Sequence, residues 1–212
     1  MKKAIVLLSG GLDSATTLFY VKKKDYKVSC LIFDYGQRHK KEILFAKKIA
    51  KIAKCPFKLI RINLPWKGSA LLERKLSIPK SYSTGIPATY VPARNTIFLS
   101  FALSFAEAIG VRDVFIGANA IDFSGYPDCR PKYYKVFNRL SKLATKAGAE
   151  NKAIKIHTPL INKTKKEIIL LARKLNVPLN LTWSCYKGGK QPCGVCDSCR
   201  LRKKGFQQAG NS

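Results

Sequence analysis

The hydrophobic positions of this 212-residue chain alternate between short continuous runs and longer stretches with helical spacing. Short apolar runs predict buried strands, and they occur at 4–8, 28–33, 57–62, 113–117 and 154–157. Between them, apolar residues three and four positions apart predict helices, which we place at 13–24, 38–53 and 94–109. Strands that alternate with helices indicate an α/β fold, a mainly parallel five-stranded sheet covered by helices on both faces.

Further elements are predicted from helix start signals and from composition. Pro131 is suited to the first position of a helix, and Thr164 with Glu167 forms a capping box that opens another. The predicted apolar stripe of the helix after Pro131 is Tyr133, Val136, Phe137, Leu140, Ala144 and Ala147. The 94–109 helix is apolar on nearly all sides, which predicts that it is buried. Residues 63–90 are rich in Pro, Ser and Gly, so we expect an irregular segment there.

Polar loops follow the predicted strands at one end of the sheet. In open parallel sheets, ligands bind beyond the carboxyl ends of the strands. That rule gathers the loops at 9–14, 34–39, 84–95 and 118–130 into one site. Each loop is rich in Gly, Ser, Asp, Arg, Tyr or Asn, a coincidence that favours an enzyme.

The composition is that of a globular protein, but the charge is strongly positive. Hydrophobic residues make up 46% and charged residues 25%, which excludes a disordered or fibrous chain. Lys and Arg number 40 against 12 acids, for a net charge of +28. Such a surface attracts anionic substrates or polyanions without proving a nucleic-acid partner. Lysine clusters such as 22–24 and 165–166 fall on the water-facing sides of predicted helices, so a solvated surface and a polyanion partner both remain open.

The chain gives no sign of a membrane segment. No apolar run approaches the ~18 residues that a membrane span needs. The apolar run Ala4–Leu8 after Lys2 and Lys3 is too short for a secretory signal. We therefore expect a cytoplasmic protein.

The sequence Ser9-Gly10-Gly11-Leu12-Asp13-Ser14 joins the first strand to the first helix. Glycines allow the backbone to approach an anion, and successive N–H groups at a helix N-terminus form a phosphate nest. The serines can add hydroxyl donors, and Asp13 can hold a cation. The alternative is a glycine-rich turn with an Asp cap. The Walker pattern is absent, so this is a different kind of phosphate loop.

Four of the seven cysteines crowd together near the end of the chain. Cys185, Cys193, Cys196 and Cys199 have a spacing that favours a metal site in a reducing compartment. Four thiolates suit a closed, structural zinc site. An iron–sulfur cluster and four unrelated thiols are the alternatives.

The Ser-Gly-Gly-x-Asp-Ser loop resembles the pyrophosphate (PP) loop of the ATP pyrophosphatase superfamily. This resemblance implies an adenine nucleotide alpha hydrolase-like fold and cleavage of ATP between its α and β phosphates, with magnesium. Carried onto this chain, it makes Asp13 and Ser14 catalytic. It assigns ATP binding to Leu8, Ser9, Gly10, Gly11, Leu12, Asp13, Ser14, Ala15, Thr16, Thr17 and Leu18.

Longer motifs narrow the resemblance to one family. They are Asp34-Tyr35-Gly36-Gln37-Arg38-His39-x-x-Glu42, Tyr90-Val91-Pro92-Ala93-Arg94-Asn95, the stretch 122–130, Ser184-Cys185-Tyr186 and the cysteine cluster. Together they resemble the 7-cyano-7-deazaguanine synthase family from residue 4 to about residue 206. The resemblance implies that ATP adenylates the carboxylate of 7-carboxy-7-deazaguanine, that ammonia gives the amide, and that a second ATP drives its dehydration to the nitrile. It also favours zinc and suggests a homodimer.

Individual site residues have alternative interpretations. Arg94 either pairs with a substrate carboxylate or phosphate, as a catalytic residue, or caps the helix that it begins. Candidate substrate-binding residues are Arg38, His39, Asn95, Asp122 and Asp128, of which the two acids suit the guanine-like edge of the base. As loop residues, these acids and Arg38 and His39 can equally have no role in binding.

We predict two parts in the chain, a PP-loop domain at 1–183 and a four-cysteine zinc knob with a C-terminal helix at 184–212. Two competing functions remain. One is a PP-loop enzyme that modifies tRNA, a thiolase or a relative of lysidine synthase, which would account for the basic surface. The other is a zinc-knuckle RNA-binding protein with a vestigial ATP site, against which the intact Asp13 and Ser14 argue.

Overall fold

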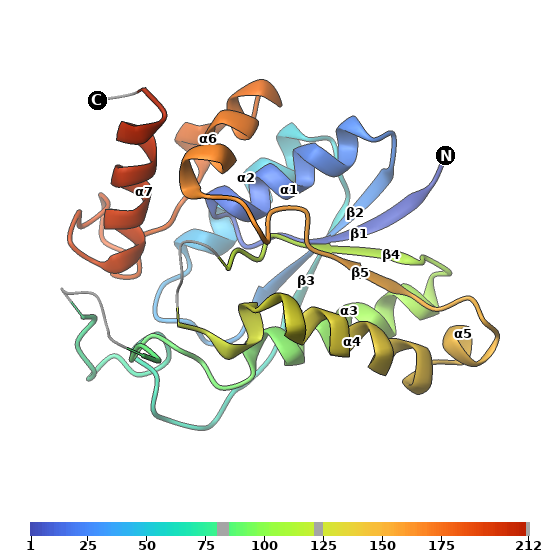
Figure 1. Ribbon diagram of the computed structural model, residues 1–212. Helices are drawn as coiled ribbons and strands as arrows, with labels where there is room; N and C mark the ends of the chain where they lie inside the picture. The colour runs from blue at the N-terminus through green and yellow to red at the C-terminus, as the bar shows by residue number, and fades with distance from the viewer. Residues whose placement is uncertain (80–84, 121–124, 211–212) are drawn as a thin grey trace.

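The computed structural model describes residues 1–79, 85–120 and 125–210. Its five strands form one parallel sheet in the order β3-β2-β1-β4-β5 (Figure 1). The strands are β1 (Lys3–Leu7), β2 (Lys27–Asp34), β3 (Phe57–Arg61), β4 (Asp113–Ile116) and β5 (Lys155–His157). The predicted α/β class is confirmed, and each strand boundary lies within one residue of its prediction.

Helices cover both faces of this sheet. They are α1 (Leu12–Lys23), α2 (Lys41–Ile52), α3 (Arg94–Ala108), α4 (Pro131–Ala144), α5 (Lys146–Ala149), α6 (Lys165–Lys174) and α7 (Asp197–Gln208), with 3₁₀ turns η1 (Pro127–Cys129) and η2 (Leu179–Leu181). Helices α1, α2 and α6 lie on one face and α3 and α4 on the other (Figure 1). The capping box at the start of α6 is present, with Thr164 N–H donating to Glu167 Oε2 at 2.7 Å.

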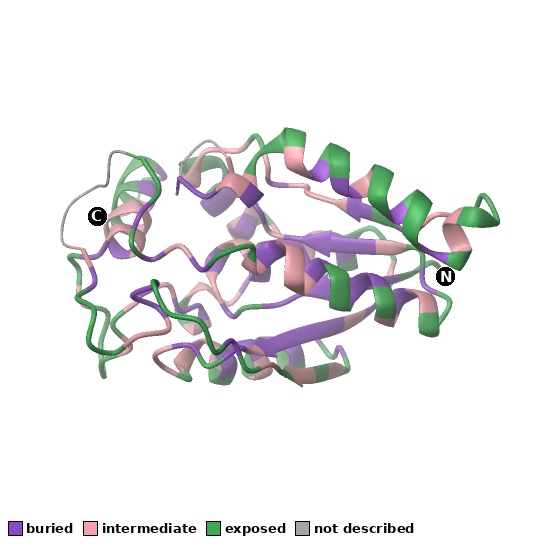
Figure 2. Ribbon diagram, turned by 90° about the horizontal axis from the view of Figure 1, so that it is seen from below, coloured by how far each residue is buried: buried purple, intermediate pink, exposed green. Residues whose placement is uncertain are grey.

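Alternate residues of the central strand build the two halves of the core. In β1, Ala4 and Val6 pack under α1 and α2, whereas Ile5 and Leu7 pack against α3. All four are almost completely buried, and Figure 2 shows the strands as the most buried layer of the molecule. Side chains of a strand point alternately to its two faces, so a continuous apolar run becomes a doubly covered central strand.

Helix α3 is not buried all round, contrary to the sequence prediction. It lies in an outer layer, and only one side of it contacts the sheet, through residues such as Leu99, Ala102 and Ala106. Phe101 lies at the edge of this contact, with its ring edge-on to Phe33 of β2, and is 43% exposed.

The apolar stripe predicted for α4 is also wrong in part. Val136 and Leu140 are exposed, and the buried face instead carries Ser141. Ser141 Oγ donates to Ile154 O at 2.7 Å, and Asn138 exchanges hydrogen bonds with the backbone of Ile156 at 2.8 and 3.1 Å. Because β5 is an edge strand, its free backbone groups need partners, and polar side chains of α4 supply them.

The segment between β3 and α3 has no helix or strand in its described part, as predicted. It is nonetheless packed, because Ala70, Leu71 and Ile78 are buried. Arg38 fastens it by donating to Leu76 O at 2.8 Å and to Arg74 O at 3.1 Å. None of the helices within the described ranges combines the length and apolarity that a membrane crossing requires.

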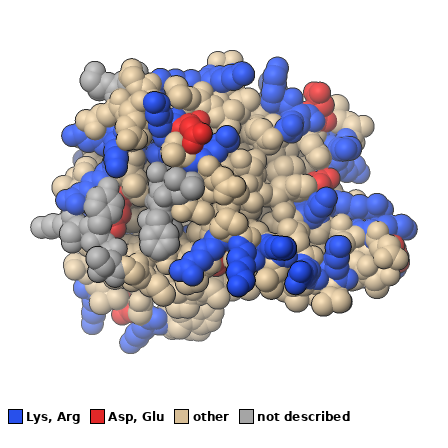
Figure 3. Space-filling view, viewed as in Figure 1, with Lys and Arg blue, Asp and Glu red and all other residues tan. Residues whose placement is uncertain are grey.

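On the face shown in Figure 3, basic side chains are widespread and few acids lie between them. The triplet 22–24 is exposed on α1, as its spacing predicted. Lys165 is the exception to the predicted solvated lysines, since its side chain is only 14% exposed and points inward.

Candidate active site

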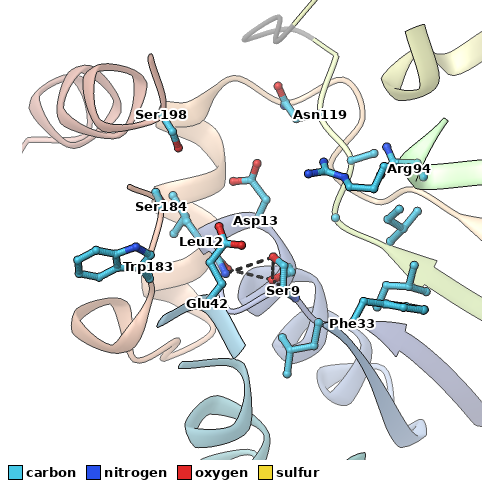
Figure 4. Close-up of a pocket in the computed structure, with 18 of the residues that line it drawn as sticks. Ser9, Leu12, Asp13, Phe33, Glu42, Arg94, Asn119, Trp183, Ser184 and Ser198 are labelled. Carbon is cyan, nitrogen blue, oxygen red and sulfur yellow. Dashed lines mark hydrogen bonds between the residues drawn. The ribbon is translucent and has the colours of Figure 1, made fainter. Parts of the chain in front are cut away.

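A cavity of about 300 Å³ opens at the carboxyl ends of the strands. Each of the four loops predicted to meet there contributes to it, through residues such as Ser9, Tyr35, Arg94 and Asn119. Figure 4 shows Ser9, Arg94 and Asn119 around the cavity. The C-terminal segment forms a further wall, which the sequence did not predict. That wall comprises Trp183, Ser184, Tyr186, Ser198, Leu201 and Arg202.

The Ser9–Ser14 loop is held in a fixed shape by its own hydrogen bonds. Ser14 Oγ accepts from Ser9 N–H at 3.2 Å, and the two hydroxyl oxygens lie 3.0 Å apart. Gly10 has φ +83°, and a β-carbon on it would lie 2.4 Å from Glu42 O, so only glycine fits against α2. Gly11 caps α1 without a side-chain hydrogen bond, which leaves the first-turn N–H groups of α1 at the cavity. This geometry suits an anion.

Gly117, directly after β4, packs against the backbone at the end of the same loop. A β-carbon at Gly117 would lie 2.8 Å from the backbone carbon and oxygen of Asp13. The start of α1 therefore packs directly against the backbone of Gly117, where no side chain intervenes. An isolated glycine after a strand gives no signal in the sequence that would reveal this contact.

Asp13 is paired with a lysine from a distant helix. Lys165 Nζ donates to both carboxylate oxygens of Asp13 at 2.8 Å, and their side chains are 14% and 25% exposed. Both residues line the cavity. In this structure the charge of Asp13 is therefore balanced by a lysine of the chain itself.

Arg94 points into the cavity from the first turn of α3 (Figure 4). The preceding residue, Ala93, has φ +51°, a left-handed conformation that is strained for alanine and turns the chain sharply before the helix. The guanidinium lies 3.4 Å from Tyr35 Oη and within 6 Å of the rings of Tyr35 and Tyr126. Asp128 caps α3 instead, by accepting from Asn95 N–H at 2.9 Å. The arrangement therefore favours the ligand-facing alternative for Arg94.

The predicted substrate-binding residues do not all reach the cavity. Asn95 lines it and also donates to Asp128 O at 3.2 Å. Asp128 and Arg38 are held in the internal hydrogen bonds given above, and His39 packs against Gly188 beside the cysteine cluster. Asp122 lies outside the described residues. The substrate roles of all five remain predictions.

Glu42 is the main cavity residue whose role the sequence did not reveal, although it ends one of the quoted motifs. It lies in the first turn of α2 and is partly buried. Burial raises the pKa of the Glu42 carboxyl from its ordinary value of 4.5 to about 7, while the Arg94 guanidinium acts in the opposite direction. Such a carboxyl is suited to exchange protons near neutral pH.

The four late cysteines converge, as predicted. Their sulfur atoms all lie within 4.8 Å of one another. A tetrahedral zinc with Zn–S bonds of 2.3 Å would set sulfurs about 3.8 Å apart, so the donor set fits one metal ion. Trp183 connects this cluster to the phosphate loop, because its indole N–H donates to Cys185 O and its backbone N–H to Gly10 O, both at 2.9 Å.

Relatives of known name cover the whole chain. The family model described as "Queuosine biosynthesis protein QueC" matches residues 3–210. A protein named 7-cyano-7-deazaguanine synthase from Picrophilus torridus is 52% identical over 100% of this chain and 90% of its own length. Another of that name from Methylococcus capsulatus is 50% identical, covering 99% of this chain and 96% of its own length.

Solved structures with low sequence identity share the fold. The U34-tRNA thiolase NcsA from Methanococcus maripaludis matches 99% of this chain and 68% of its own, with a TM-score of 0.53 and 16% identity. The NMN synthetase from Francisella tularensis matches 100% and 87%, with a TM-score of 0.52 and 13% identity. These likenesses agree with the predicted PP-loop, adenine nucleotide alpha hydrolase-like fold. From the family match and the full-length identities, we conclude that this chain belongs to the QueC family of queuosine biosynthesis proteins.

Proposed function

We propose that this chain is an ATP-dependent, C–N bond-forming enzyme that converts 7-carboxy-7-deazaguanine and ammonia to 7-cyano-7-deazaguanine. The observation that carries the proposal is the 50–52% identity, over nearly the whole length, to proteins named 7-cyano-7-deazaguanine synthase. A cavity that combines a phosphate loop, an inward arginine and a carboxyl group supports it.

In this proposal, residues 8–18 bind ATP, with the loop N–H groups holding the terminal phosphates. A carboxylate oxygen is a poor leaving group until AMP is attached to it. Fixed donors at the loop and Arg94 stabilise the negative charge that develops as pyrophosphate departs. Ser14 holds Ser9 in place, and Asp13 with Lys165 balances charge at the loop. Magnesium, with its usual phosphate ligands, would neutralise the nucleotide.

We further propose that the four cysteines hold a structural zinc ion. Four sulfurs within 4.8 Å leave room for one ion and no open coordination position. The ion would fix residues 184–212 against the domain formed by residues 1–183, and so hold Ser198 and Arg202 at the cavity. Reduced thiols are needed for this site, which favours the cytoplasm. A homodimer is proposed from the family resemblance, and no nucleic acid is required for the reaction.

The direct test supplies ATP, magnesium, an ammonium salt and 7-carboxy-7-deazaguanine, and follows products by mass spectrometry. The expected products are the amide, the nitrile and AMP. Asp13→Asn is expected to abolish AMP formation while the circular dichroism spectrum stays unchanged. Formation of AMP without the deazaguanine acid, or with tRNA alone, would contradict the proposal.

A further inference from the structure

Glu42 places a carboxyl group beside the phosphate loop. Its backbone oxygen lies against Gly10, so the start of α2 is fixed to the loop by direct contact. Its side chain extends into the cavity on the side where Ser9 and Asp13 lie (Figure 4). Glu42 therefore lies beside the loop that the proposed function assigns to the phosphates of ATP, in the same cavity as Arg94.

No hydrogen bond or ion pair holds the Glu42 carboxylate within residues 1–79, 85–120 and 125–210. The groups around it are mostly aromatic. Tyr35 and Tyr186 are close enough for its charge to raise the pKa of each phenol, to which burial contributes most. Arg94 is a cation whose charge acts on the Glu42 carboxyl, and its guanidinium contacts the rings of Tyr35 and Tyr126. A partly buried carboxylate without a donor is costly unless a ligand supplies one.

The other charged groups of the cavity indicate what kind of ligand this is. Asp13 is already paired with Lys165, so a divalent cation at Glu42 would have one free carboxylate and two nearby cationic side chains, Lys165 and Arg94. Lys41, next to Glu42 in the chain, points away and lies 4.3 Å from the Trp183 ring centroid. A small monovalent cation fits better, because it needs less compensating negative charge than a divalent ion and one free carboxylate can supply it.

We propose that Glu42 binds the ammonium ion used in the reaction and accepts one of its protons, releasing ammonia beside the adenylated carboxylate. This inference rests on the proposed function. Ammonia then attacks the acyl carbon, so that the C–N bond forms and the C–O bond to AMP breaks. AMP leaves with the electron pair of that bond. The amide nitrogen loses its extra proton to water, and protonated Glu42 returns its own proton to solvent.

The test compares two nucleophiles in wild type and in Glu42→Gln. Ammonium must lose a proton before it can attack, whereas hydroxylamine is largely neutral at pH 7.5 and gives the hydroxamate directly. Loss of a general base typically lowers the rate by about 10²-fold or more. We therefore expect amide formation from ammonium to fall about 100-fold in Glu42→Gln, and hydroxamate formation to change by less than about 3-fold. Raising the pH toward that at which free ammonia predominates is expected to restore the ammonium reaction.

The controls separate this inference from the proposed function. Glu150→Gln, on the exposed turn after α5, is the matched surface variant and is expected to behave as wild type with both nucleophiles. Equal losses with ammonium and hydroxylamine would overturn the role of Glu42. Loss of substrate-dependent exchange of pyrophosphate into ATP in Glu42→Gln would also overturn it. That result would mean that Glu42 acts in the adenylation step, as a magnesium ligand would, and not on ammonium. If wild type itself forms no AMP with the deazaguanine acid, the proposed function fails, whatever Glu42 does.

Discussion

Lys165 Nζ lies 2.8 Å from both carboxylate oxygens of Asp13, and this pair joins the first turn of α6 to the first turn of α1. The pair is largely shielded from water, so its two hydrogen bonds are stronger than those of a surface ion pair. It connects a residue of the phosphate loop to a helix about 150 positions later in the chain.

The first prediction concerns the energetic coupling of this pair. Asp13→Asn and Lys165→Met are each expected to lower the free energy of unfolding by about 1–3 kcal/mol, because each leaves a charged partner short of hydrogen bonds. The double variant should lose less than the sum, with a coupling energy of about 1 kcal/mol or more. Urea unfolding of the four proteins measures this. Strictly additive losses would mean that the two groups do not interact in solution.

The second prediction concerns Gly117. Gly117→Ala is expected to lower the free energy of unfolding by about 1–3 kcal/mol, because the new β-carbon would lie 2.8 Å from the backbone of Asp13. The start of α1 must then shift, so AMP formation should fall as well. Gly189→Ala is the control, since its β-carbon would have only one neighbour, at 3.5 Å. Thermal melting and AMP assays of both variants provide the measurement, and identical behaviour of the two would refute the contact.

The third prediction concerns the cysteine cluster. Cys196→Ser is expected to lower bound metal and melting temperature together, because metal affinity contributes to folding energy in such sites. Cys129→Ser, which removes a thiol outside the cluster, should keep the metal. For both variants, mass spectrometry measures the bound metal and calorimetry measures the melting temperature. A metal-free Cys196→Ser protein that melts like wild type would contradict a structural ion.

The fourth prediction concerns pH and stability at Glu42. The pKa of this carboxyl is higher in the folded protein, about 7, than its ordinary value of 4.5. Its contribution to stability is therefore full below about pH 4.5 and is lost as the pH rises through 7. Glu42→Gln removes the buried charge, so the variant should gain about 1–3 kcal/mol relative to wild type at pH 8 and almost nothing near pH 4. Urea unfolding at the two pH values measures the difference, and a constant difference would show that Glu42 is not desolvated.

The sequence sufficed for features that depend on local pattern. Continuous apolar runs such as Ala4–Leu8 located the strands, and the rule that ligands bind at the carboxyl ends of parallel strands brought together four loops that do line one cavity. The spacing of Cys185 to Cys199 identified a cluster of thiols that do converge. Each of these signals lies within a short stretch of chain. General rules of folding then predict where the residues of that stretch lie in the structure.

The features that the sequence did not reveal depend on contacts between distant segments. Ser141 is buried on α4 because an edge strand needs hydrogen-bond partners, and no pattern within the helix indicates that need. Lys165 looks like one of many surface lysines until α6 is placed beside α1. Trp183 stacks on Phe45 and also forms part of the cavity wall, and nothing in the residues around it in the chain indicates that second position.

The wall contributed by the C-terminal segment has a consequence for biosynthesis of the protein. A chain that has left the ribosome only as far as α6 already possesses the nucleotide loop, yet one flank of its cavity is open to water. This flank is complete only once the segment through Arg202 has been made, and in our proposal the ion held by the four thiols then fixes it. A full-length chain without the proposed ion would then keep the Ser9–Ser14 loop but hold this flank of its cavity less firmly.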